Sequence, residues 1–360
     1  MSDGSTAYTT RKMTTYTEIL SIKLGRAICA AMLTCVPLHV HALEFDFGTP
    51  IGFSQQALDA LSRAARQWTS RIDDPITVNI ETSFLDFDNT NTIASALSVT
   101  LISGLTFSDT VINKLKIDAA AEGDDGIVAS LPSVSNLHFD LPSNIDFLGD
   151  LAGTKANFKA IALPGFDLDD LFGARDGLIN FNLDFNFDFD NSDGVTAGHM
   201  DFETVAAHEL GHALGFISAV DDVDFLLSQG RSGTIAPTLL DLFRFAPGAD
   251  DPVDAADFAT ATRNLIPGDA AFFDDIDNEY LFSTGVFAGD GRQASHWKDT
   301  NSIGLLDPTL AFGQVFTVSA ADLRALDVIG YDVTAVPLPP AILFFASALA
   351  FLARRNSRPH

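Results

Sequence analysis

The chain has 360 residues, of which 47% are hydrophobic, and its formal net charge is −27. This length suits one large domain or two small ones, and the apolar content is sufficient for a sizeable core. So negative a chain is unsuited to nucleic acid or to anionic membrane surfaces, and we expect no nucleic-acid partner.

The N-terminal segment has the organisation of an export signal. Basic residues precede an apolar run that ends at Ala42, and Val40 and Ala42 match the small-residue pattern of signal-peptidase sites. We therefore expect residues 1–42 to be a signal peptide, with a buried N-terminal helix as the alternative. Cys29 and Cys35 both lie in this segment, so the mature domain is expected to have no disulfide.

The next two segments carry regular patterns. Apolar residues recur at helical spacing over residues 54–72, which predicts an amphipathic helix. Ile76, Val78 and Ile80 alternate with polar residues and predict a strand over residues 74–84. Residues 84–175 show no pattern clear enough to assign.

Residues 179–190, "INFNLDFNFDFD", form the clearest strand pattern in the chain. Aromatic and leucine side chains alternate with Asn and Asp along the whole segment, so one apolar face is expected. The turn that follows, "DFDNSDG", has some of the carboxylates of a calcium loop, but Ser192 and Asp193 disturb the spacing. Ca²⁺ is therefore a secondary prediction, and a solvated acidic turn is the alternative.

The stretch "AAHELGHALGFIS" predicts a metal site on a helix. His208 and His212 are four residues apart, so both imidazoles lie on one helical face. Glu209 follows the first histidine at a position from which it can face a water molecule on the metal. Asp201 is a suitable N-cap, and Gly215 is placed to end the helix.

These residue types match the chemistry of zinc hydrolases. Zn²⁺ binds neutral imidazole nitrogens, keeps one position open for water, and lowers the pKa of that water. Glu209 is then expected to act as the catalytic base, accepting a proton from water and delivering it to the leaving amine. A chance occurrence of the pattern on a core helix is the alternative.

The C-terminal half has fewer regular elements. Residues 238–246 and 271–276 are apolar enough to be short buried elements. A closing helix is predicted over residues 319–333, with Ser319 as its N-cap and Gly330 as its stop.

Four segments together resemble a known group of proteins. The motif H-E-L-G-H-A-L-G-F, with "STGVFAGDGRQASHW", "LLDPTLAFG" and "DLRALDVIGYDV", is similar to exported bacterial zinc metallopeptidases of the metzincin type that carry PEP-CTERM tails. The likeness covers roughly residues 175–360 well, and the N-terminal half only as a helix followed by a strand. It implies that the strand at 179–190 supplies the edge that pairs with an extended substrate, with an ordinary half-buried strand as the alternative.

The third metal ligand depends on this resemblance. Metzincins have a histidine six residues after the second one, where this chain has Ser218. Leishmanolysin-like members insert a subdomain before the third histidine, and the context then favours His296. Their methionine turn would correspond to Leu306, an apolar residue of similar volume. His138 and His199 lack such a context.

Other groups stay open as alternatives. Asp221, Asp222 and Asp224 are rival third ligands, because some zincins use an aspartate just beyond the metal-binding helix. Tyr280 and Tyr331 are weak candidates for a hydroxyl that helps to stabilise the oxyanion.

Residues 336–360 resemble a PEP-CTERM sorting tail. A V-P-x-P entry, a short apolar run and two arginines are present, although Leu338 replaces the usual glutamate. The likeness implies an exosortase-like sorting enzyme as a partner, transient membrane association through this tail, and an extracellular or cell-surface location in a Gram-negative bacterium. A plain membrane anchor is the alternative.

Together these features predict an α+β, metzincin-like zincin domain over residues 43–335. Its zinc-binding active-site helix would lie between an N-terminal, sheet-containing subdomain and a loop-rich C-terminal subdomain. The expected function is a secreted zinc metalloendopeptidase acting on protein or peptide substrates, with His208, His212 and His296 as ligands. The alternative is a non-catalytic surface or matrix-binding protein on the same scaffold, which would have no need of Glu209.

Overall fold

The computed structural model of the chain has a mixed α+β architecture, with eight α-helices and several small sheets among the residues described here. It describes residues 42–87, 91–102, 108–122, 126–162, 167–248, 250–299 and 302–334. The predicted sorting tail, and the predicted signal peptide up to residue 41, lie outside these ranges. None of the described helices is long and apolar enough to cross a bilayer.

A four-stranded sheet forms the N-terminal half. Its order is β1 (Glu44–Asp46), β2 (Thr77–Leu85), β8 (Gly177–Asn182) and β3 (Ala94–Ser98). The first three strands are parallel, whereas β3 runs antiparallel to β8 at the edge. The predicted strand at 74–84 is confirmed as β2, because its alternating apolar residues lie buried.

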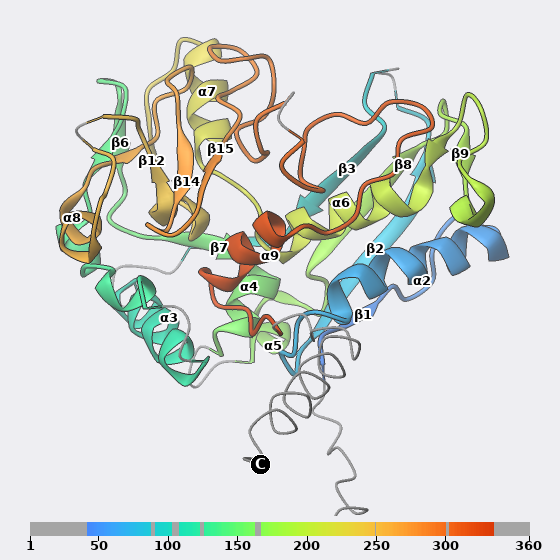
Figure 1. The fold of residues 1–360 in the computed structure, drawn as a ribbon, viewed down its shortest axis with the longest axis horizontal. Coiled ribbons are helices and arrows are strands. Elements are labelled where there is room, and N and C mark those ends of the chain that lie inside the picture. The colour runs from blue at the N-terminus through green and yellow to red at the C-terminus, as the bar shows by residue number, and fades with distance from the viewer. Residues whose placement is uncertain are drawn as a thin grey trace, which may run out of the picture. The chain divides into compact units, whose positions relative to one another are not determined.

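Two helices pack together beside this sheet. α2 (Gln55–Thr69) begins after Ser54, whose side chain accepts a hydrogen bond from the Ala57 amide. α6 (Phe202–Leu214) packs against α2 and also contacts β3 (Figure 1). Trp68 of α2 is fully buried and donates from its indole nitrogen to the Ala207 carbonyl, 2.8 Å away. This contact connects the first predicted helix directly to α6, the helix that carries His208 and His212.

The prediction of one strand over residues 179–190 is wrong. β8 ends at Asn182, and Phe187–Asp188 forms a separate short strand, β9, which pairs with β10 (Met200–Asp201). The Asn182 side chain accepts the Asp184 amide at 2.9 Å, a local bond that competes with strand pairing. Leu183 is consequently 59% exposed instead of facing the core.

The expected edge role of this segment is also wrong. β8 lies inside the sheet between β2 and β3, so it has no free side for a substrate. The edge strand next to β8 is β3, which lies within the part of the chain that shows no clear sequence pattern. Its short, half-polar sequence ASALS has weak alternation, and only pairing with β8 reveals it.

A five-stranded sheet forms the C-terminal half. Its order is β15 (Glu279–Leu281), β14 (Phe272–Asp274), β12 (Arg244–Phe245), β13 (Arg263–Asn264) and β5 (Phe139–Asp140). The two predicted buried elements are confirmed, since they contain β12 and β14 and their phenylalanines lie in the core. In Figure 1 this sheet lies to the left of α6, whereas β2, β3 and β8 of the N-terminal sheet overlap α6 and extend to its right.

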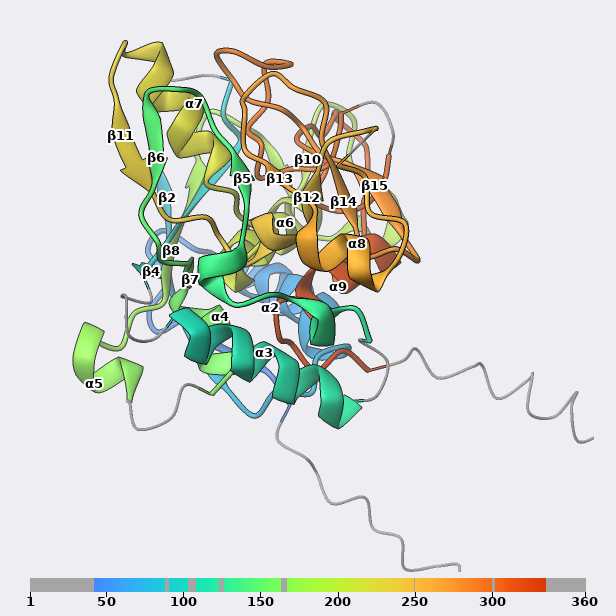
Figure 2. The ribbon, with the colours of Figure 1, turned by 90° about the vertical axis from the view of Figure 1, so that its left-hand side faces the viewer.

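The remaining elements connect and cover the two halves, as Figure 2 shows from a second direction. Two further strand pairs are β4 (Thr100–Ile102) with β7 (Ala152–Thr154), and β6 (Ile145–Phe147) with β11 (Gly233–Ile235). The other helices are α3 (Ser108–Glu122), α4 (Lys155–Ala160), α5 (Leu168–Phe172), α7 (Val220–Ser228), α8 (Ala255–Thr260) and α9 (Ala320–Asp327).

The closing helix is shorter than its pattern predicts. Ser319 is the N-cap of α9, as expected, and forms a capping box with Asp322. The helix ends at Asp327, and the chain turns at Gly330, where φ is +98°. Residues 331–333 therefore leave the helix. Tyr331 is buried and bonds to the Leu214 carbonyl at 2.6 Å, which joins the end of this region to the end of α6.

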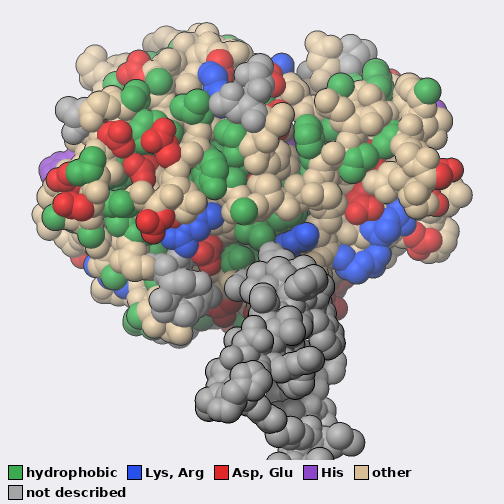
Figure 3. All heavy atoms as spheres, in the orientation of Figure 1, with side chains coloured by type: hydrophobic (Ala, Val, Ile, Leu, Met, Phe, Trp, Pro, Cys, Tyr) green, Lys and Arg blue, Asp and Glu red, His purple; other side chains and the backbone are tan. Residues whose placement is uncertain are grey.

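The surface reflects the composition. On the face drawn in Figure 3, acidic side chains are spread over several regions, and the described Lys and Arg side chains form small groups. This distribution agrees with the net charge of −27.

Candidate metal centre

The local structure of α6 follows its sequence. The Asp201 side chain caps the helix by accepting the Thr204 amide at 3.0 Å, and Glu203 lies in the first turn. Gly215, with φ of +127°, reverses the chain so that the Phe216 amide reaches the Gly211 carbonyl at 3.1 Å. The predicted helix and both of its ends are confirmed.

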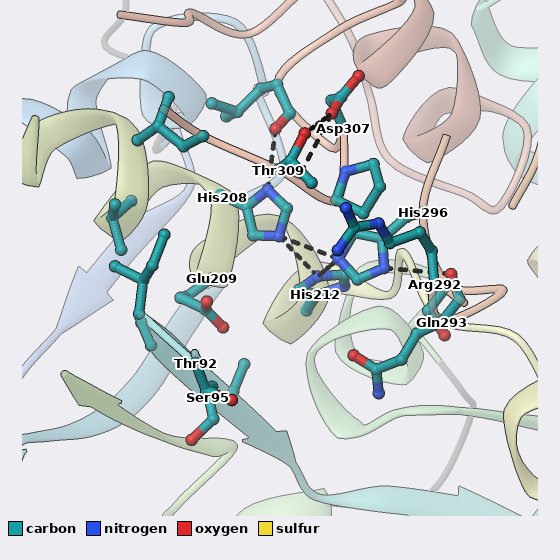
Figure 4. Close-up of a pocket in the computed structure, with 18 of the residues that line it drawn as sticks. Thr92, Ser95, His208, Glu209, His212, Arg292, Gln293, His296, Asp307 and Thr309 are labelled. Carbon is teal, nitrogen blue, oxygen red and sulfur yellow. Dashed lines mark hydrogen bonds between the residues drawn. The ribbon is translucent and has the colours of Figure 1, made fainter. Parts of the chain in front are cut away.

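Three histidines meet at one point. The Nε2 atoms of His208 and His212 are 3.1 Å apart, and each lies 3.2 Å from Nε2 of His296. Figure 4 shows the three rings turned toward a common centre. Among the described residues this is the one group of three His, Cys, Asp or Glu side chains close enough to bind a metal ion.

The hydrogen bond made by the outer nitrogen of each ring, Nδ1, determines which of the two ring nitrogens carries the proton. Nδ1 of His208 faces the Leu305 carbonyl at 2.9 Å, and Nδ1 of His212 faces the Phe216 carbonyl at 2.7 Å. Nδ1 of His296 faces the Gln293 carbonyl at 3.3 Å. Because a carbonyl oxygen only accepts, each Nδ1 carries the proton and each Nε2 presents a lone pair.

This arrangement fits a bound cation. Three lone pairs directed at each other without a proton between them repel, and a positive ion at their centre removes the repulsion. Tetrahedral bonds of about 2.0–2.1 Å would separate two ligand nitrogens by about 3.3 Å, close to the observed spacings.

Burial keeps the imidazoles neutral. It lowers the pKa of His208, and it lowers the pKa of His212 to about 3, with the neighbouring His208 as a further cause. Burial likewise lowers the pKa of His296 well below its ordinary value, followed by the effects of His212 and His208. Neutral imidazole is the form that binds metals, so the site does not have to lose protons at physiological pH.

Glu209 lies beside the triad but is not part of it. Its side chain is directed toward the segment that carries Thr92 and Ser95 (Figure 4). Burial raises the pKa of Glu209 to about 8, against a lowering by a hydrogen bond from the Ala96 backbone. A carboxyl group whose pKa is shifted toward neutral pH by burial is typical of catalytic acids and bases.

The triad lies at the bottom of a cleft of about 880 Å³. One wall is β3 with the residues before it, from Asn91 to Ser98, and α6 forms the floor. The opposite side consists of residues 291–293, 295–296, 305 and 307–310. The cleft therefore brings together the edge of the N-terminal sheet and two loops of the C-terminal half.

Leu306 lies under α6, at the place that the resemblance implies for it. It is fully buried, and a Cβ placed on Gly211 would come within 3.0 Å of its Cδ2 atom. Gly211 immediately precedes His212 on the helix. The residue before Leu306 supplies the carbonyl that accepts from His208, so this turn both supports the helix and orients a ligand.

Asp322 of α9 is a supporting residue that sequence reasoning missed. Its Oδ1 accepts from the Trp297 indole at 2.8 Å and from the Leu306 amide at 3.2 Å, and its Oδ2 accepts from the Leu305 amide at 2.7 Å. One buried carboxylate thus connects the residue after His296 to the turn beneath α6. A lone aspartate in a helical pattern gives no sign of such a role.

The rival aspartates are not at the triad. Asp221 and Asp224 accept hydrogen bonds from backbone amides of the loop that leads to His296, and Asp222 is exposed. Ser218 donates its hydroxyl to Asp241 at 2.6 Å. The proposal that one of the three aspartates is the third ligand is therefore contradicted by their positions.

Four other candidates also lie away from the cleft. The exposed His138 and the partly exposed His199 are not in the metal group. The Tyr331 hydroxyl donates a hydrogen bond to the Leu214 carbonyl, and the Tyr280 hydroxyl faces Asn278 Oδ1 at 3.4 Å. Neither tyrosine lines the cleft, so neither is placed to assist an oxyanion.

In the turn predicted as a possible calcium site, the carboxylates accept hydrogen bonds from backbone amides of the same turn. Asp188 accepts the amides of Asp190 and Thr196, and Asp190 accepts the amide of Ser192. These carboxylates are not gathered into a metal-binding group in the described part of the chain. The geometry gives the Ca²⁺ prediction no support.

Comparison with protein-family models, with curated proteins and with solved structures finds no match to this chain.

Proposed function

We propose that the chain is a zinc-dependent endopeptidase of the metzincin type, with a leishmanolysin-like ligand arrangement. The observation that carries the proposal is the set of three imidazoles, one buried and two partly buried, with inward lone pairs and Glu209 directly beside them. A structural metal site has no use for an adjacent buried carboxylate that binds no metal, whereas hydrolysis of a peptide bond needs a base there.

The three histidines and Glu209 have different roles in the proposed reaction. His208, His212 and His296 would hold Zn²⁺, which supplies Lewis acidity toward a water molecule and toward the carbonyl of the scissile bond. Glu209 accepts a proton from the attacking water and passes it to the leaving amine. Its buried position suits this transfer, because the surroundings keep the proton from bulk solvent between the two steps.

β3 offers a surface for the substrate backbone. One side of β3 pairs with β8, and none of the described strands pairs with its other side, which forms a wall of the cleft. An extended peptide can add there as a further strand and cross the metal site. This binding mode does not require a free end of the substrate chain, which suits an endopeptidase. The Ala96 backbone also bonds to Glu209, so the strand that binds substrate positions the base.

A peptidase assay with a chelator tests the proposal. The full chain is incubated with casein before and after removal of metal, and zinc is then restored. Glu209→Gln should keep the bound metal and lose about 10²–10⁴-fold in rate or more. Glu203→Gln is the matched control, since Glu203 is on the same helix but bonds to Arg63 outside the cleft.

The outcome separates the proposal from its rival. A Glu209→Gln variant that digests casein at the wild-type rate would remove the enzymatic interpretation. A wild-type chain that binds zinc but hydrolyses neither casein nor other denatured proteins would favour the non-catalytic, surface-binding alternative.

Export and sorting are a second part of the proposal and rest on the sequence. Residues 1–42 have the pattern of a signal peptide, and residues 336–360 resemble a tail processed by an exosortase-like enzyme after transient membrane association. We propose an extracellular or cell-surface location in a Gram-negative bacterium.

A further inference from the structure

The loop that carries His296 is built as a hairpin. Phe282 and Trp297 form an antiparallel bridge at its base, and their rings stack with centroids 5.1 Å apart. The Ser283 amide donates to the His296 carbonyl at 3.0 Å, and a second bridge joins Gly285 to Arg292. The base of the hairpin is thus well defined, but it does not by itself determine how the His296 side of the loop meets α6.

Asp221, in the first turn of α7, holds the strand of the hairpin just before His296. Its Oδ1 accepts the Ala294 amide at 2.6 Å, and its Oδ2 accepts the Ser295 amide at 3.1 Å. The Ser295 hydroxyl also donates to Oδ2. All three donors belong to the two residues that precede the metal ligand.

Asp224, one turn later on α7, holds the outer part of the same hairpin. Its two carboxylate oxygens accept the amides of Phe287 and Ala288 at 2.8 and 2.9 Å. The contact is so close that a Cβ on Gly285 would lie 2.9 Å from Asp224 Oδ2. With φ of +128° at this position, residue 285 must be glycine for the hairpin to reach the helix.

α7 is itself anchored to the end of the metal-binding region. Asp241 accepts the Ser218 hydroxyl at 2.6 Å and the Ala219 amide at 2.9 Å, which fixes the link between α6 and α7. The Ser218 amide in turn donates to the Ser295 hydroxyl at 2.9 Å. A continuous set of bonds therefore runs from the end of α6, through the first turn of α7, to the residue before His296.

We propose that Asp221, supported by Asp224, is a positioning residue for the third metal ligand. The carboxylate of Asp221 holds the backbone of residues 294 and 295 so that His296 is directed at His208 and His212 before any metal binds. Hydrogen bonds to a buried carboxylate are charge-assisted and strong enough to restrict a loop in this way. The inference rests on the metal site of the proposed function, but it concerns binding and not hydrolysis.

Cobalt(II) binding to the full chain tests the assignment. Metal is removed with a chelator, and the wild type, Asp221→Asn and Asp222→Asn are titrated with cobalt(II) chloride while the visible spectrum is recorded. Asp222→Asn is the matched control, because it makes the same change on the same helical turn at an exposed position. The melting temperature of each metal-free protein is measured in parallel.

Asp221→Asn should weaken cobalt binding about 10- to 100-fold, the range typical for partners that orient metal ligands. Its visible spectrum at saturating cobalt should differ from that of the wild type, because a displaced His296 changes the coordination. Asp222→Asn should match the wild type in both respects. Wild-type affinity and spectrum in Asp221→Asn would overturn the proposal, as would an equal loss in both variants.

Two further comparisons keep the test decisive. If Asp221→Asn does not fold, Ser295→Ala is titrated instead, since it removes one donor to Asp221 and leaves the charge in place. Weaker binding in Ser295→Ala supports the positioning role, and unchanged binding overturns it. A wild type that binds no cobalt would overturn the metal site and with it the proposed function, whereas normal wild-type binding confines any failure to Asp221.

Discussion

Nε2 of His212 and Nε2 of His296 lie 3.2 Å apart, although 84 residues separate the two histidines in the chain. Two of the three candidate ligands come from one helix with its own caps, so their relative position is a local property of α6. The third comes from a hairpin supported by α7 and α9. Metal affinity should therefore respond to residues that never touch the metal.

The histidine variants test which side chains bind the metal. His296→Ala should abolish tight metal binding, because two imidazoles leave the ion short of the three protein ligands usual at a catalytic site. His138→Ala and His199→Ala should retain it, since both residues lie outside the group. Metal content after dialysis, measured by elemental analysis, decides the matter. Full retention in His296→Ala would exclude the assignment of that residue.

Gly211→Ala should destabilise the protein by about 1–2 kcal/mol, although alanine favours helices by about 1 kcal/mol over glycine. The added methyl group would lie 3.0 Å from both Leu306 and Trp68, which are fully buried and have no room to move. Unfolding in denaturant measures the loss. Leu306→Ala by itself should cost about 2–5 kcal/mol.

The double variant provides the control for that interpretation. Shortening Leu306 makes space for the methyl group on Gly211, so the two changes together should cost less than their sum, with a coupling of about 0.5–3 kcal/mol. If the free-energy losses of the two single variants simply add up in the double variant, the close approach of α6 to the turn does not affect stability.

Asp322→Asn should cost about 2–4 kcal/mol of stability and weaken metal binding. Both carboxylate oxygens accept N–H groups from Trp297, Leu305, Leu306 and Ser319, and an amide has only one oxygen to offer them. Urea unfolding and metal titration measure the two effects. The exposed Asp269→Asn variant is the comparison and should change neither. Equal behaviour of the two variants would count against a role for Asp322 in joining the loops.

Asp74 should make the protein less stable as pH rises from about 4 to 7. Burial raises the pKa of Asp74 to about 7 in the folded chain, against a lowering by the Asp332 amide, whereas the ordinary value of 3.8 applies when the chain is unfolded. Between these values the folded state binds more protons, so the free energy of unfolding falls with rising pH. Well above pH 7 the stabilisation contributed by the protonated Asp74 side chain is lost completely.

Asp74→Asn should remove this dependence. Its stability relative to the wild type should increase between pH 4 and pH 7 by up to about 4 kcal/mol and then stay constant. Unfolding curves at several pH values, with Asp73→Asn as the neighbouring control, measure the difference. Parallel pH profiles of wild type and Asp74→Asn would contradict the prediction.

The tail from Val336 should be missing from the mature protein outside the cell. The V-P-L-P-P entry, the apolar run and Arg354 with Arg355 resemble a tail that is removed during sorting. Intact mass of protein recovered from the native host checks this. Recovery of an extracellular chain that still ends at His360 would argue for a plain anchor or for no processing.

The sequence alone determined the parts of the site that depend on neighbours within one helix. The spacing of His208 and His212, the cap at Asp201 and the turn at Gly215 all act within a few residues, so the helical period and the cap chemistry are enough to predict them. The same holds for the helix after Ser54 and for the cap at Ser319. For the third metal ligand, the sequence favoured His296 only through the family resemblance, and three aspartates remained as alternatives.

Tertiary structure decided everything that depends on pairing between distant segments. β3 is the edge strand that lines the cleft because it pairs with β8. The strand pattern of residues 179–190 is interrupted because the Asn182 side chain accepts a hydrogen bond from the nearby Asp184 amide. Asp221 and Asp224 proved to hold the loop and not the metal, since a carboxylate in a sequence carries no information about which donors will surround it. Those donors come from a hairpin more than 60 residues away, and only the folded chain brings them together.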